Sequence, residues 1–572
     1  MPVLSRFVPH WLKSYPRADL GADLAAGLIV AILVIPQSMA YALLAGLPPQ
    51  FGLYASILPA IAYALLGSSM VQVVGPVAVT AIMTYAVLSP LAAPHSPQYI
   101  VLAAVLALLS GLILLAGGLL RLGFLSQLLS RPVVSGFISG SAVLIVVSQL
   151  KYLFGLSLAG NHSSTIVIDL LSHLDRVHGP TLAVSLTALA LLLVFRRWLA
   201  GWLRRVGLGA AAAAFVGRLM PLLIVLLATL LTIEFDLDVR HGVAVVGTVV
   251  TGLPPPNFFL PGFDTVRSLI VPAFLMALIG MVQNITMAQA LAIRRRERID
   301  PNAELTGLGA ANIFAAFSGG MPVGGGLSRS AINVAAGART PLATIVSALV
   351  MIGVVAGAAG WFARLPLAVL AATIIMAAVP MIDLRALRQA WAYDRADALA
   401  LLGTAGGVLV FGLETGIGLG VMLSLAALLY RFSLPHMAVL GRIPGSEHFR
   451  NVERHAVETL PGVLFLRIDE SLFFGNLGAV EQRLKQELER IPGVRDLVLV
   501  MSAVNLMDAT AVEVFGELNR ELVERGIRLH LAEVKGPVQD RLQHSPLWPV
   551  LSGEVFLSAN AAFEALGGAA RR

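Results

Sequence analysis

Hydrophobic residues form long runs separated by short polar stretches between residues 22 and 431. Fourteen such segments, divided by proline, glycine or charged residues, lie at 22–47, 51–68, 74–89, 98–120, 131–155, 179–196, 211–233, 268–293, 302–318, 327–338, 340–361, 365–382, 396–413 and 414–431. A helix needs about 20 apolar residues to cross a bilayer. Most runs approach that length, whereas the third and the tenth are unusually short. The pattern predicts a multi-span α-helical membrane protein with fourteen spans.

Both short segments begin beside residues that interrupt a helix. Gly75-Pro76 opens the third segment, and the stretch 319–326, GGMPVGGG, precedes the tenth. In a helix interior glycine costs about 1 kcal/mol and proline about 3 kcal/mol. We therefore expect an unwound stretch at both places and a short helix after each, with Ser328 as the N-cap of the second. Interrupted segments at matching places in two halves of a chain indicate the midplane binding site of a transporter.

Arg329 falls in the first turn of the second short helix. A helix N-terminus is positive and disfavours a cation by about 0.3 to 1 kcal/mol, and burial at membrane depth adds about 2.5 to 3.5 kcal/mol. Both terms become favourable when an anion binds the helix end and the guanidinium. In the alternative interpretation the glycines let helices approach closely, and Arg329 reaches an interface or pairs with a distant carboxylate. We predict an anion site formed by Arg329, Ser328 and the two helix ends, at Gly75 and Gly326.

Polar side chains also occur at equivalent places in the first and eighth apolar segments. Gln37 and Tyr41 lie in the first, and Gln283 and Asn284 in the eighth. Such groups need a partner or a water-filled cavity at membrane depth. Hydrogen bonds between helices would satisfy them equally well. Gln37 is the best candidate for a ligand contact, because Pro36 frees nearby backbone carbonyls and Tyr41 lies one turn further on. We also include Gln283 among the candidate substrate-binding residues.

Composition excludes several classes of protein. The 572 residues are 57% hydrophobic and 13% charged, far more apolar than a soluble globular chain of this length, so the lipid bilayer is the expected environment. The net charge of +7 comes from arginines between the spans and not from a basic patch with interleaved aromatics, which argues against a nucleic-acid partner. The absence of cysteine excludes thiolate catalysis and cysteine-based metal sites. We expect no cofactor, no metal and no catalytic residue.

Arginine positions predict the topology, because cytoplasmic loops are enriched in Lys and Arg. With the N-terminus inside, the arginines of inside positions are at 121, 131, 196, 197, 204, 205, 294–296, 298, 385, 388 and 395. An even number of spans then leaves both termini cytoplasmic, and residues 1–21 form a cytoplasmic lead-in without a cleavable signal peptide. Seven spans per half, an odd number, orient the halves oppositely. This predicts an inverted repeat whose broken segments face each other.

The charge density rises after residue 433, where the transmembrane domain (22–433) is expected to end. We predict a linker at 434–460 and a compact domain at 461–572. The expected strands are 463–468, 496–501 and 527–534, and the expected helices are 477–490 and 509–525. This alternation is typical of α/β domains, and no nucleotide-binding or metal motif accompanies it. We predict a regulatory or docking module, with a cytoplasmic protein as its possible partner.

Several long stretches resemble the SulP family of anion transporters, which includes bacterial sulfate permeases and prestin. They are IPQSMAYALLAGLPPQFGLYASILPAIAYALLGSS, VVGPVAV and MPVGGGLSRSAINVAAGARTPLA. The C-terminal stretch LVLVMSAVNLMDATAVEVFGEL is similar to a STAS domain. The resemblance covers nearly the whole chain. It implies two inverted seven-helix repeats divided into core and gate domains, an elevator-like or rocking movement, a homodimer, and a bacterial inner membrane location.

The resemblance also implies where the anion binds. In the family the anion lies between the third and tenth spans. Carried over residue by residue, the contacts are Gln37 and Tyr41 in the first span, Val77 in the third, and Leu327, Ser328 and Arg329 in the tenth.

Two departures from the family pattern bear on mechanism. Many members have a glutamate where this chain has Gln283, and that carboxylate is the usual candidate for carrying a proton or helping to bind sodium. Because glutamine does not titrate, coupling through this position is not expected. In the STAS segment relatives have a serine after the aspartate, whereas this chain reads Asp508-Ala509-Thr510. A phosphorylation switch at that position is not expected either.

We predict secondary active or facilitative transport of a small anion, such as sulfate, bicarbonate, chloride or a dicarboxylate, by alternating access of core against gate. A nucleobase transporter of the same architecture is the alternative, although that chemistry favours a carboxylate in place of Gln283. An intramembrane serine hydrolase using Ser328 would need a base and an oxyanion hole. Its sequence context lacks the second glycine of a nucleophile elbow, and the central apolar segments contain no histidine.

Overall fold

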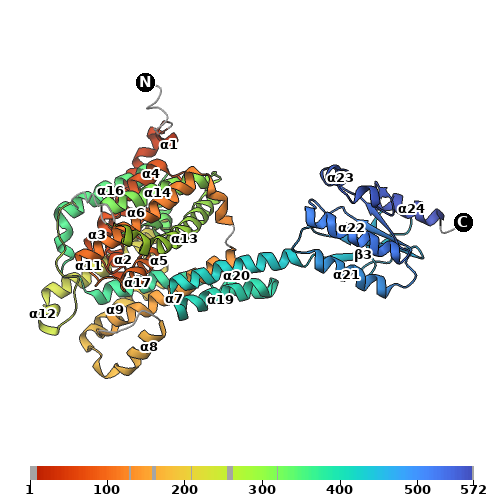
Figure 1. Cartoon of the computed structure of the whole chain (residues 1–572). Helices are drawn as coiled ribbons and strands as arrows, with labels where there is room; N and C mark the ends of the chain where they lie inside the picture. Colours follow the sequence, from red (N-terminus) through yellow and green to blue (C-terminus); the bar gives the residue numbers. More distant parts are fainter. Residues whose placement is uncertain are drawn as a thin grey trace. The chain divides into compact units, whose positions relative to one another are not determined.

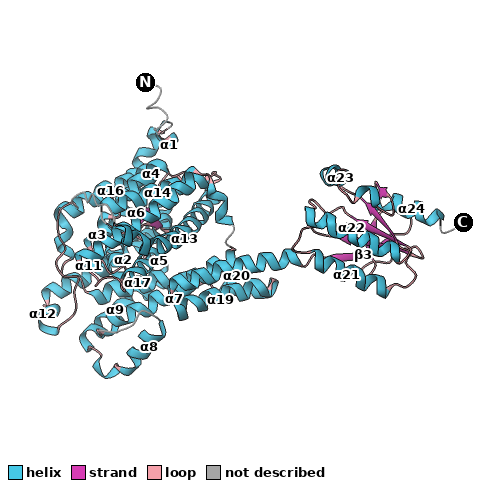
Figure 2. Ribbon diagram, in the orientation of Figure 1, coloured by secondary structure: helices cyan, strands magenta, loops and turns pink. Residues whose placement is uncertain are grey.

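The computed structural model describes residues 9–13, 15–127, 130–156, 163–207, 209–253, 262–318 and 320–569. The chain divides into two compact units, residues 1–424 and 425–572. The first is almost entirely helical, and the second combines helices with a sheet (Figure 2). The predicted lead-in at 1–21 falls partly outside the described residues.

The first unit contains a long series of helices (Figure 1). They are α1 (His10–Lys13), α2 (Leu20–Leu44), α3 (Gln50–Tyr54), α4 (Leu58–Leu66), α5 (Ala78–Leu88), α6 (Pro97–Leu119), α7 (Arg131–Phe154), α8 (Ser163–Ser172), α9 (Gly179–Val194), α10 (Ala200–Arg205), α11 (Ala210–Glu234), α12 (Leu237–His241), α13 (Phe263–Arg295), α14 (Pro301–Ser318), α15 (Leu327–Ala335), α16 (Leu342–Gly353), α17 (Leu367–Ala378), α18 (Leu384–Tyr393), α19 (Arg395–Phe411) and α20 (Leu413–Ser433).

Every predicted apolar segment coincides with one or two of these helices. Within the described residues, seven helices are long and apolar enough to cross a membrane, judged by length and composition, and four shorter apolar helices accompany them. The prediction of a multi-span helical protein is confirmed, whereas the number of fourteen spans stays a prediction. Helices α8, α10, α12 and α18 lie between the predicted segments and were not expected.

Small residues let the central helices approach closely. Helix α14 packs against α6 and α4, and α16 packs against α2. A Cβ atom added at Gly309 of α14 would lie 2.6 Å from the backbone nitrogen of Leu115 in α6, and one added at Gly111 would lie 2.8 Å from the Gly309 oxygen. Glycine is therefore required at both positions for this helix contact, as is common where helices associate in membranes.

The two predicted broken segments meet in a short antiparallel ribbon. Strand β1 (Val74–Gly75) pairs with β2 (Gly324–Gly325), Val74 opposite Gly325 and Gly75 opposite Gly324. Figure 2 shows this ribbon in magenta among the helices of the first unit. Helix α5 follows β1 and helix α15 follows β2. With 11 and 9 residues, they are about 16 and 14 Å long at 1.5 Å per residue, roughly half a bilayer.

The N-cap of α15 lies two residues before the predicted one. We expected Ser328 as the N-cap, but the helix begins at Leu327 and its N-cap is Gly326. Gly326 has an extended backbone that continues directly from β2, so the ribbon and not a side-chain cap determines where the helix starts.

The second unit is built on a six-stranded sheet of order β4-β3-β5-β6-β7-β8. Its strands are β3 (Met437–Arg442), β4 (Phe449–Asn451), β5 (Val463–Ile468), β6 (Asp496–Val500), β7 (Arg528–Ala532) and β8 (Val555–Phe556), and its helices are α21 (Leu477–Arg490), α22 (Ala509–Glu524), α23 (Gly536–Gln543) and α24 (Ala559–Ala569). Strands β5 to β8 are parallel, while β3 and β4 are antiparallel to their neighbours. The predicted strands and helices match β5 to β7, α21 and α22 to within two residues.

The structure corrects the linker that we predicted at 434–460. Residues 437–440 of β3 pair with residues 465–468 of β5, so the sheet begins at Met437. Side chains alternate between the two faces, because Met437 joins the core under α21 and α22, whereas Ala438 and Leu440 join the core under α24. Because β3 pairs with β4 on one side and with β5 on the other, this segment is an inner strand and not a connection.

Candidate functional site

Side chains of α15 fasten the segment that leads into α5. The hydroxyl of Ser330 accepts a hydrogen bond from the Val73 backbone N–H at 3.0 Å, and the Asn333 side-chain amide donates to the Val71 carbonyl at 2.9 Å. The backbone N–H of Gly326 donates to the Val73 carbonyl at 3.1 Å. Ser330 and Asn333 are fully buried. The second short helix thus fixes the backbone in front of the first.

The converse contacts fasten the segment that leads into α15. The Thr80 hydroxyl in α5 donates to the Pro322 carbonyl at 3.2 Å. Asn312 of α14 donates to the Val323 carbonyl at 3.0 Å and accepts from the Val323 N–H at 2.9 Å. The predicted proximity of the two broken segments is therefore confirmed. First-turn N–H groups have no partner within their own helix, so the N-terminal end of each short helix is positively polarised. The two positively polarised ends lie close together.

Arg329 lies beside this ribbon and is almost completely buried, with 1% of its surface exposed. One terminal nitrogen, Nη2, donates to the Ser38 hydroxyl at 3.0 Å, and Nη1 donates to the Ser56 hydroxyl at 3.3 Å. The Nε atom has no hydrogen-bond partner among the described residues. Among the described residues, no ion pair involves Arg329. The alternative in which it pairs with a distant carboxylate therefore receives no support.

The glycines make room for this guanidinium. A Cβ atom added at Gly75 would collide with Arg329 Nη1, and one added at Gly326 would lie 3.3 Å from Arg329 Cδ. A side chain at residue 75 would occupy the space of the cation, so glycine at this position follows from the arginine. The glycine-rich stretches therefore do more than allow helices to pack.

Two serine hydroxyls do not balance a buried cation. Removing a charge from water costs several kcal/mol even after the protein relaxes. A hydrogen bond to a charged group returns about 1.5 to 3 kcal/mol. Both hydroxyls also have other contacts, since Ser38 donates to the Val34 carbonyl, Ser56 to the Gly52 carbonyl, and the two oxygens lie 3.0 Å apart. The arrangement retains unused positive charge, which a small anion would neutralise.

The structure also locates the predicted contacts of the first and third spans. The Gln37 side-chain amide donates to the Tyr41 hydroxyl at 2.8 Å, and Tyr41 is buried within electrostatic range of Arg329. Val77 is the N-cap of α5. Its methyl groups would lie 3.1 and 3.4 Å from Cβ atoms added at Gly324 and Gly326. Val77 therefore packs over the glycines of the second broken segment.

Three predicted positions remain less defined or lie elsewhere. Leu327 and Ser328 form the start of α15, but their side chains lie outside the described part of the structure. Gln283 lines a small apolar cavity of about 30 Å³ together with Phe137 of α7 and Thr404 of α19. Neither Ser38 nor Ser56, the hydrogen-bond partners of Arg329, lines this cavity.

The neighbouring amide, Asn284, faces the ribbon instead of Gln283. Its Oδ1 atom would lie 2.6 Å from a Cβ atom added at Gly325. Adjacent residues of a helix point about 100° apart, so the two amides cannot share one environment. Sequence reasoning weighed both residues and selected Gln283. It missed Ser38 and Ser56 altogether, and the signal available for them was a serine within a strongly apolar segment.

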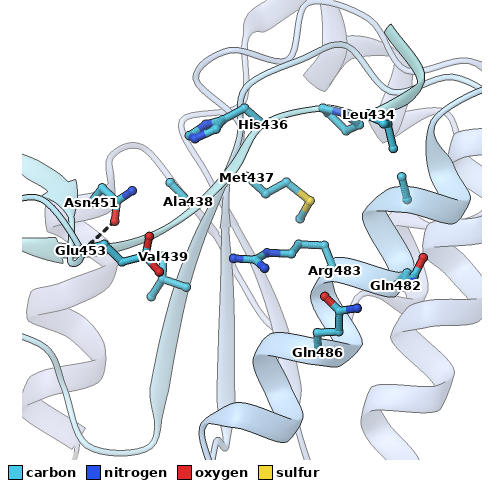
Figure 3. A pocket seen from close by; sticks show the side chains of 12 residues that line it. Leu434, His436, Met437, Ala438, Val439, Asn451, Glu453, Gln482, Arg483 and Gln486 are labelled. Carbon is cyan, nitrogen blue, oxygen red and sulfur yellow. Dashed lines mark hydrogen bonds between the residues drawn. The ribbon is translucent and has the colours of Figure 1, made fainter. Parts of the chain in front are cut away.

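The second unit has a pocket of its own, with a volume of about 470 Å³ (Figure 3). It is lined by residues 434–439 of the β3 segment and by residues of β4 and α21. Arg483 and Glu453 extend into it from opposite sides. Arg483 forms an ion pair with the buried Glu487 at 2.6 Å, so its charge is already balanced. This pocket does not offer the unpaired positive charge found at Arg329.

Comparison with known sequences connects this geometry to characterised families. The sulfate permease family pattern matches residues 20–404, and the STAS domain pattern matches residues 454–562. A probable sulfate transporter of Mycobacterium tuberculosis (strain CDC 1551 / Oshkosh) is 36% identical over 556 residues, which cover 97% of this chain and 96% of the relative. A probable sulfate transporter of Arabidopsis thaliana is 33% identical and covers 96% of this chain and 81% of the relative.

Solved structures share the fold. The anion transporter Slc26a9 of the mouse, in an inward-facing state, superposes with a TM-score of 0.89 at 22% sequence identity, over 99% of this chain and 95% of the other. The transmembrane domain of the cyanobacterial bicarbonate transporter BicA superposes with a TM-score of 0.60 at 22% identity, over 70% of this chain and 98% of the other. At these identities the superpositions establish the fold alone.

Proposed function

Because the chain belongs to the sulfate permease family, it is an anion transporter and not an enzyme, and we propose that it binds its anion between the N-terminal ends of α5 and α15. The observation that carries this proposal is the buried guanidinium of Arg329, which has two serine partners and no ion pair among the described residues. At an effective dielectric constant near 20, the Coulomb attraction between the guanidinium and an anion about 4 Å away is about 4 kcal/mol.

The proposed site combines three kinds of donor. Arg329 supplies the charge, the first-turn N–H groups of α5 and α15 supply backbone donors, and the hydroxyls of Ser38 and Ser56 hold the guanidinium in place. We include Gln37, Tyr41, Val77, Leu327 and Ser328 as lining residues, as the family resemblance implies. A site of this chemistry suits sulfate, bicarbonate, chloride or a dicarboxylate. Sulfate is the first anion to test, because two curated relatives are named as probable sulfate transporters.

Several further features belong to the same proposal. The protein works as a homodimer in a bacterial inner membrane, with both termini in the cytoplasm. Its two inverted repeats move core against gate, and the STAS domain binds a cytoplasmic protein. Since Gln283 cannot carry a proton, we expect transport driven by the anion gradient, and uptake of the anion should be unaffected by an imposed proton or sodium gradient.

The proposal is tested by uptake into proteoliposomes across a panel of labelled sulfate, bicarbonate, chloride and a dicarboxylate. We expect Arg329→Ala to lower uptake at subsaturating anion by about tenfold or more, because a charged hydrogen bond contributes about 1.5 to 3 kcal/mol and 1.4 kcal/mol is a factor of ten. Arg267→Ala, which alters an exposed arginine of α13, is the matched control. Absence of binding and uptake for every anion of the panel would refute the proposal.

The nucleobase alternative is separated by competition. Uracil and xanthine should leave anion uptake unchanged, because the described polar groups around Arg329 are hydroxyls and amides and include no carboxylate that could pair with a base edge. Inhibition by either base at concentrations comparable to the anion would favour the alternative.

A further inference from the structure

The segment that leads into β1 is attached to a buried carboxylate. Glu304 lies in the first turn of α14 and has no exposed surface. Its Oε1 atom accepts hydrogen bonds from the backbone N–H groups of Ser68 at 3.0 Å and Ser69 at 2.9 Å, and from the Ser68 hydroxyl at 2.8 Å. The Ser68 oxygen in turn accepts from the Asp300 N–H at 3.0 Å. One oxygen of Glu304 thus fixes the loop between α4 and the ribbon.

The other oxygen of Glu304 fixes an amide of α13. Oε2 accepts from the Tyr63 hydroxyl at 2.5 Å and from the Asn284 side-chain nitrogen at 2.8 Å. Asn284 is oriented by this bond, because its nitrogen must face the carboxylate and its oxygen must face away. That oxygen accepts from the Gln72 side chain at 2.5 Å. The hydrogen bonds therefore run without interruption from Glu304 through Asn284 to Gln72, two residues before β1.

Asn284 and Gln72 support the ribbon on the face opposite Arg329. A Cβ atom added at Gly325 would lie 2.6 Å from Asn284 Oδ1 and 2.6 Å from Gln72 Nε2, whereas one added at Gly75 would meet the guanidinium. Successive residues of a strand point to opposite faces, and Gly325 lies across from Val74, not from Gly75. The ribbon is therefore held between Arg329 on one face and the two amides on the other.

Among the described residues, five groups donate a hydrogen bond to Glu304, and each of its oxygens faces at least one N–H group that can only donate, so only a carboxylate satisfies them. A glutamine at this position would keep one accepting oxygen and would place an NH₂ group against donors. Either the Ser68–Ser69 loop or the Tyr63 and Asn284 side chains would lose their acceptor. We propose that Glu304 is a positioning residue for the anion site, which acts through Asn284 and Gln72 to hold the ribbon against Arg329. This inference rests on the proposed anion site.

The test measures equilibrium binding and uptake of labelled sulfate by the full-length chain. Glu304→Gln should raise both the Kd and the KM by about tenfold, as expected for a lost buried acceptor, and should leave the maximal uptake rate within about twofold. Asn284→Ala should raise the KM similarly. The KM of the double variant should be no higher than that of the more strongly affected single variant, because the effects of substitutions in one chain of contacts are not additive.

Asp23→Asn is the matched control. Asp23 is also fully buried and also accepts from backbone N–H groups, those of Arg339 at 2.7 Å and Thr340 at 3.1 Å, and from the Tyr15 hydroxyl at 3.1 Å. In the part of the chain that the structure describes, none of its hydrogen bonds reaches Asn284 or Gln72. Asp23→Asn should lower the melting temperature but leave the KM within about twofold of the native value.

Three outcomes would overturn the inference. They are a KM for Glu304→Gln no higher than that for Asp23→Asn, additive effects of Glu304→Gln and Asn284→Ala, and, where Glu304→Gln does not fold, a native KM for Asn284→Ala. If the native chain binds neither sulfate nor any other anion of the panel, the proposed function fails and this inference fails with it. Native binding together with an unchanged Glu304→Gln variant rejects the inference alone.

Discussion

At the scale of single residues, the site depends on side chains whose role only the folded chain reveals. Ser38 and Ser56 contact Arg329 from positions 291 and 273 residues away in the sequence. A serine inside an apolar helix usually bonds the carbonyl one turn earlier, and Ser38 does so as well, with Val34. Nothing in its sequence context distinguishes that ordinary role from a second role as the acceptor for an arginine.

Substitution of Ser38 provides a test at this scale. Ser38→Ala leaves one guanidinium nitrogen without its acceptor, and we expect the free energy of unfolding to fall by about 1 to 3 kcal/mol. Ser318→Ala is the matched control, because Ser318 is also buried and bonds only the Phe314 carbonyl of its own helix among the described residues. Thermal unfolding in detergent measures both. Equal losses for the two variants would mean that the Arg329 contact contributes no stability.

Anion affinity should change along with stability in Ser38→Ala but not in Ser318→Ala. Without Ser38 the guanidinium is less firmly directed, so the KM for sulfate should rise several-fold. A native KM in Ser38→Ala would show that Ser56 alone is sufficient to hold the guanidinium.

At the scale of elements, the local preferences of glycine and proline predicted the positions of the unwound segments and short helices, but not the features that depend on distant parts of the chain. Glycine and proline marked both unwound segments and both short helices, because they disfavour helix wherever they occur. The same rules could not recognise β3, whose status as an inner strand depends on β5, some 25 residues later. Likewise, the choice between Gln283 and Asn284 depends on the rotation of α13 about its axis, which its apolar sequence leaves undetermined.

The attachment of β3 to the sheet can be tested through pH. The side chains of His436 and Asp469 meet at 2.8 Å, and Arg467 also bonds Asp469. Burial alone would raise the pKa of Asp469, but the hydrogen bonds from Arg467 and His436 outweigh it and leave the pKa lowered. A lowered pKa stabilises the fold above the unfolded value of about 3.9, and this contribution is lost as the pH falls through the folded value.

Asp469→Asn should therefore lower the melting temperature of the full chain at pH 5 and above. The difference from the native chain should shrink as the pH falls from about 4 towards the lowered pKa. Thermal unfolding followed by circular dichroism between pH 3 and 7 measures it. A difference that stays constant over this range would contradict the stabilising role of the ionised carboxylate.

At the scale of the whole molecule, the sequence predicted the class of fold and its division into a helical membrane unit and a sheet-containing unit, since both follow from long-range composition. Orientation across the membrane is a further prediction, drawn from the positions of arginine. These 572 residues contain no cysteine, so single introduced cysteines report accessibility without background.

Two exposed positions lie on opposite sides of the membrane in the predicted topology and can test it. Val206 follows the arginine-rich helix α10, and Val239 lies in α12, beside Asp236 and Asp238. Val239→Cys should react with a membrane-impermeant maleimide in intact cells, whereas Val206→Cys should react only after the membrane is opened. Both substituted chains should retain anion uptake. The reverse pattern of labelling would invert the topology.

The ribbon between β1 and β2 also limits how the protein can work. Its hydrogen bonds are buried, and separating the strands would expose unsatisfied amides at a cost of about 1 to 3 kcal/mol each. Hydrogen bonds also join the two broken segments beside the ribbon. The Gly326 N–H donates to the Val73 carbonyl, and the Thr80 hydroxyl donates to the Pro322 carbonyl. We therefore expect the two half-helices to stay together when an ion is released. We propose that the movement that exposes the anion to the opposite side of the membrane carries both half-helices and the ribbon as one rigid piece.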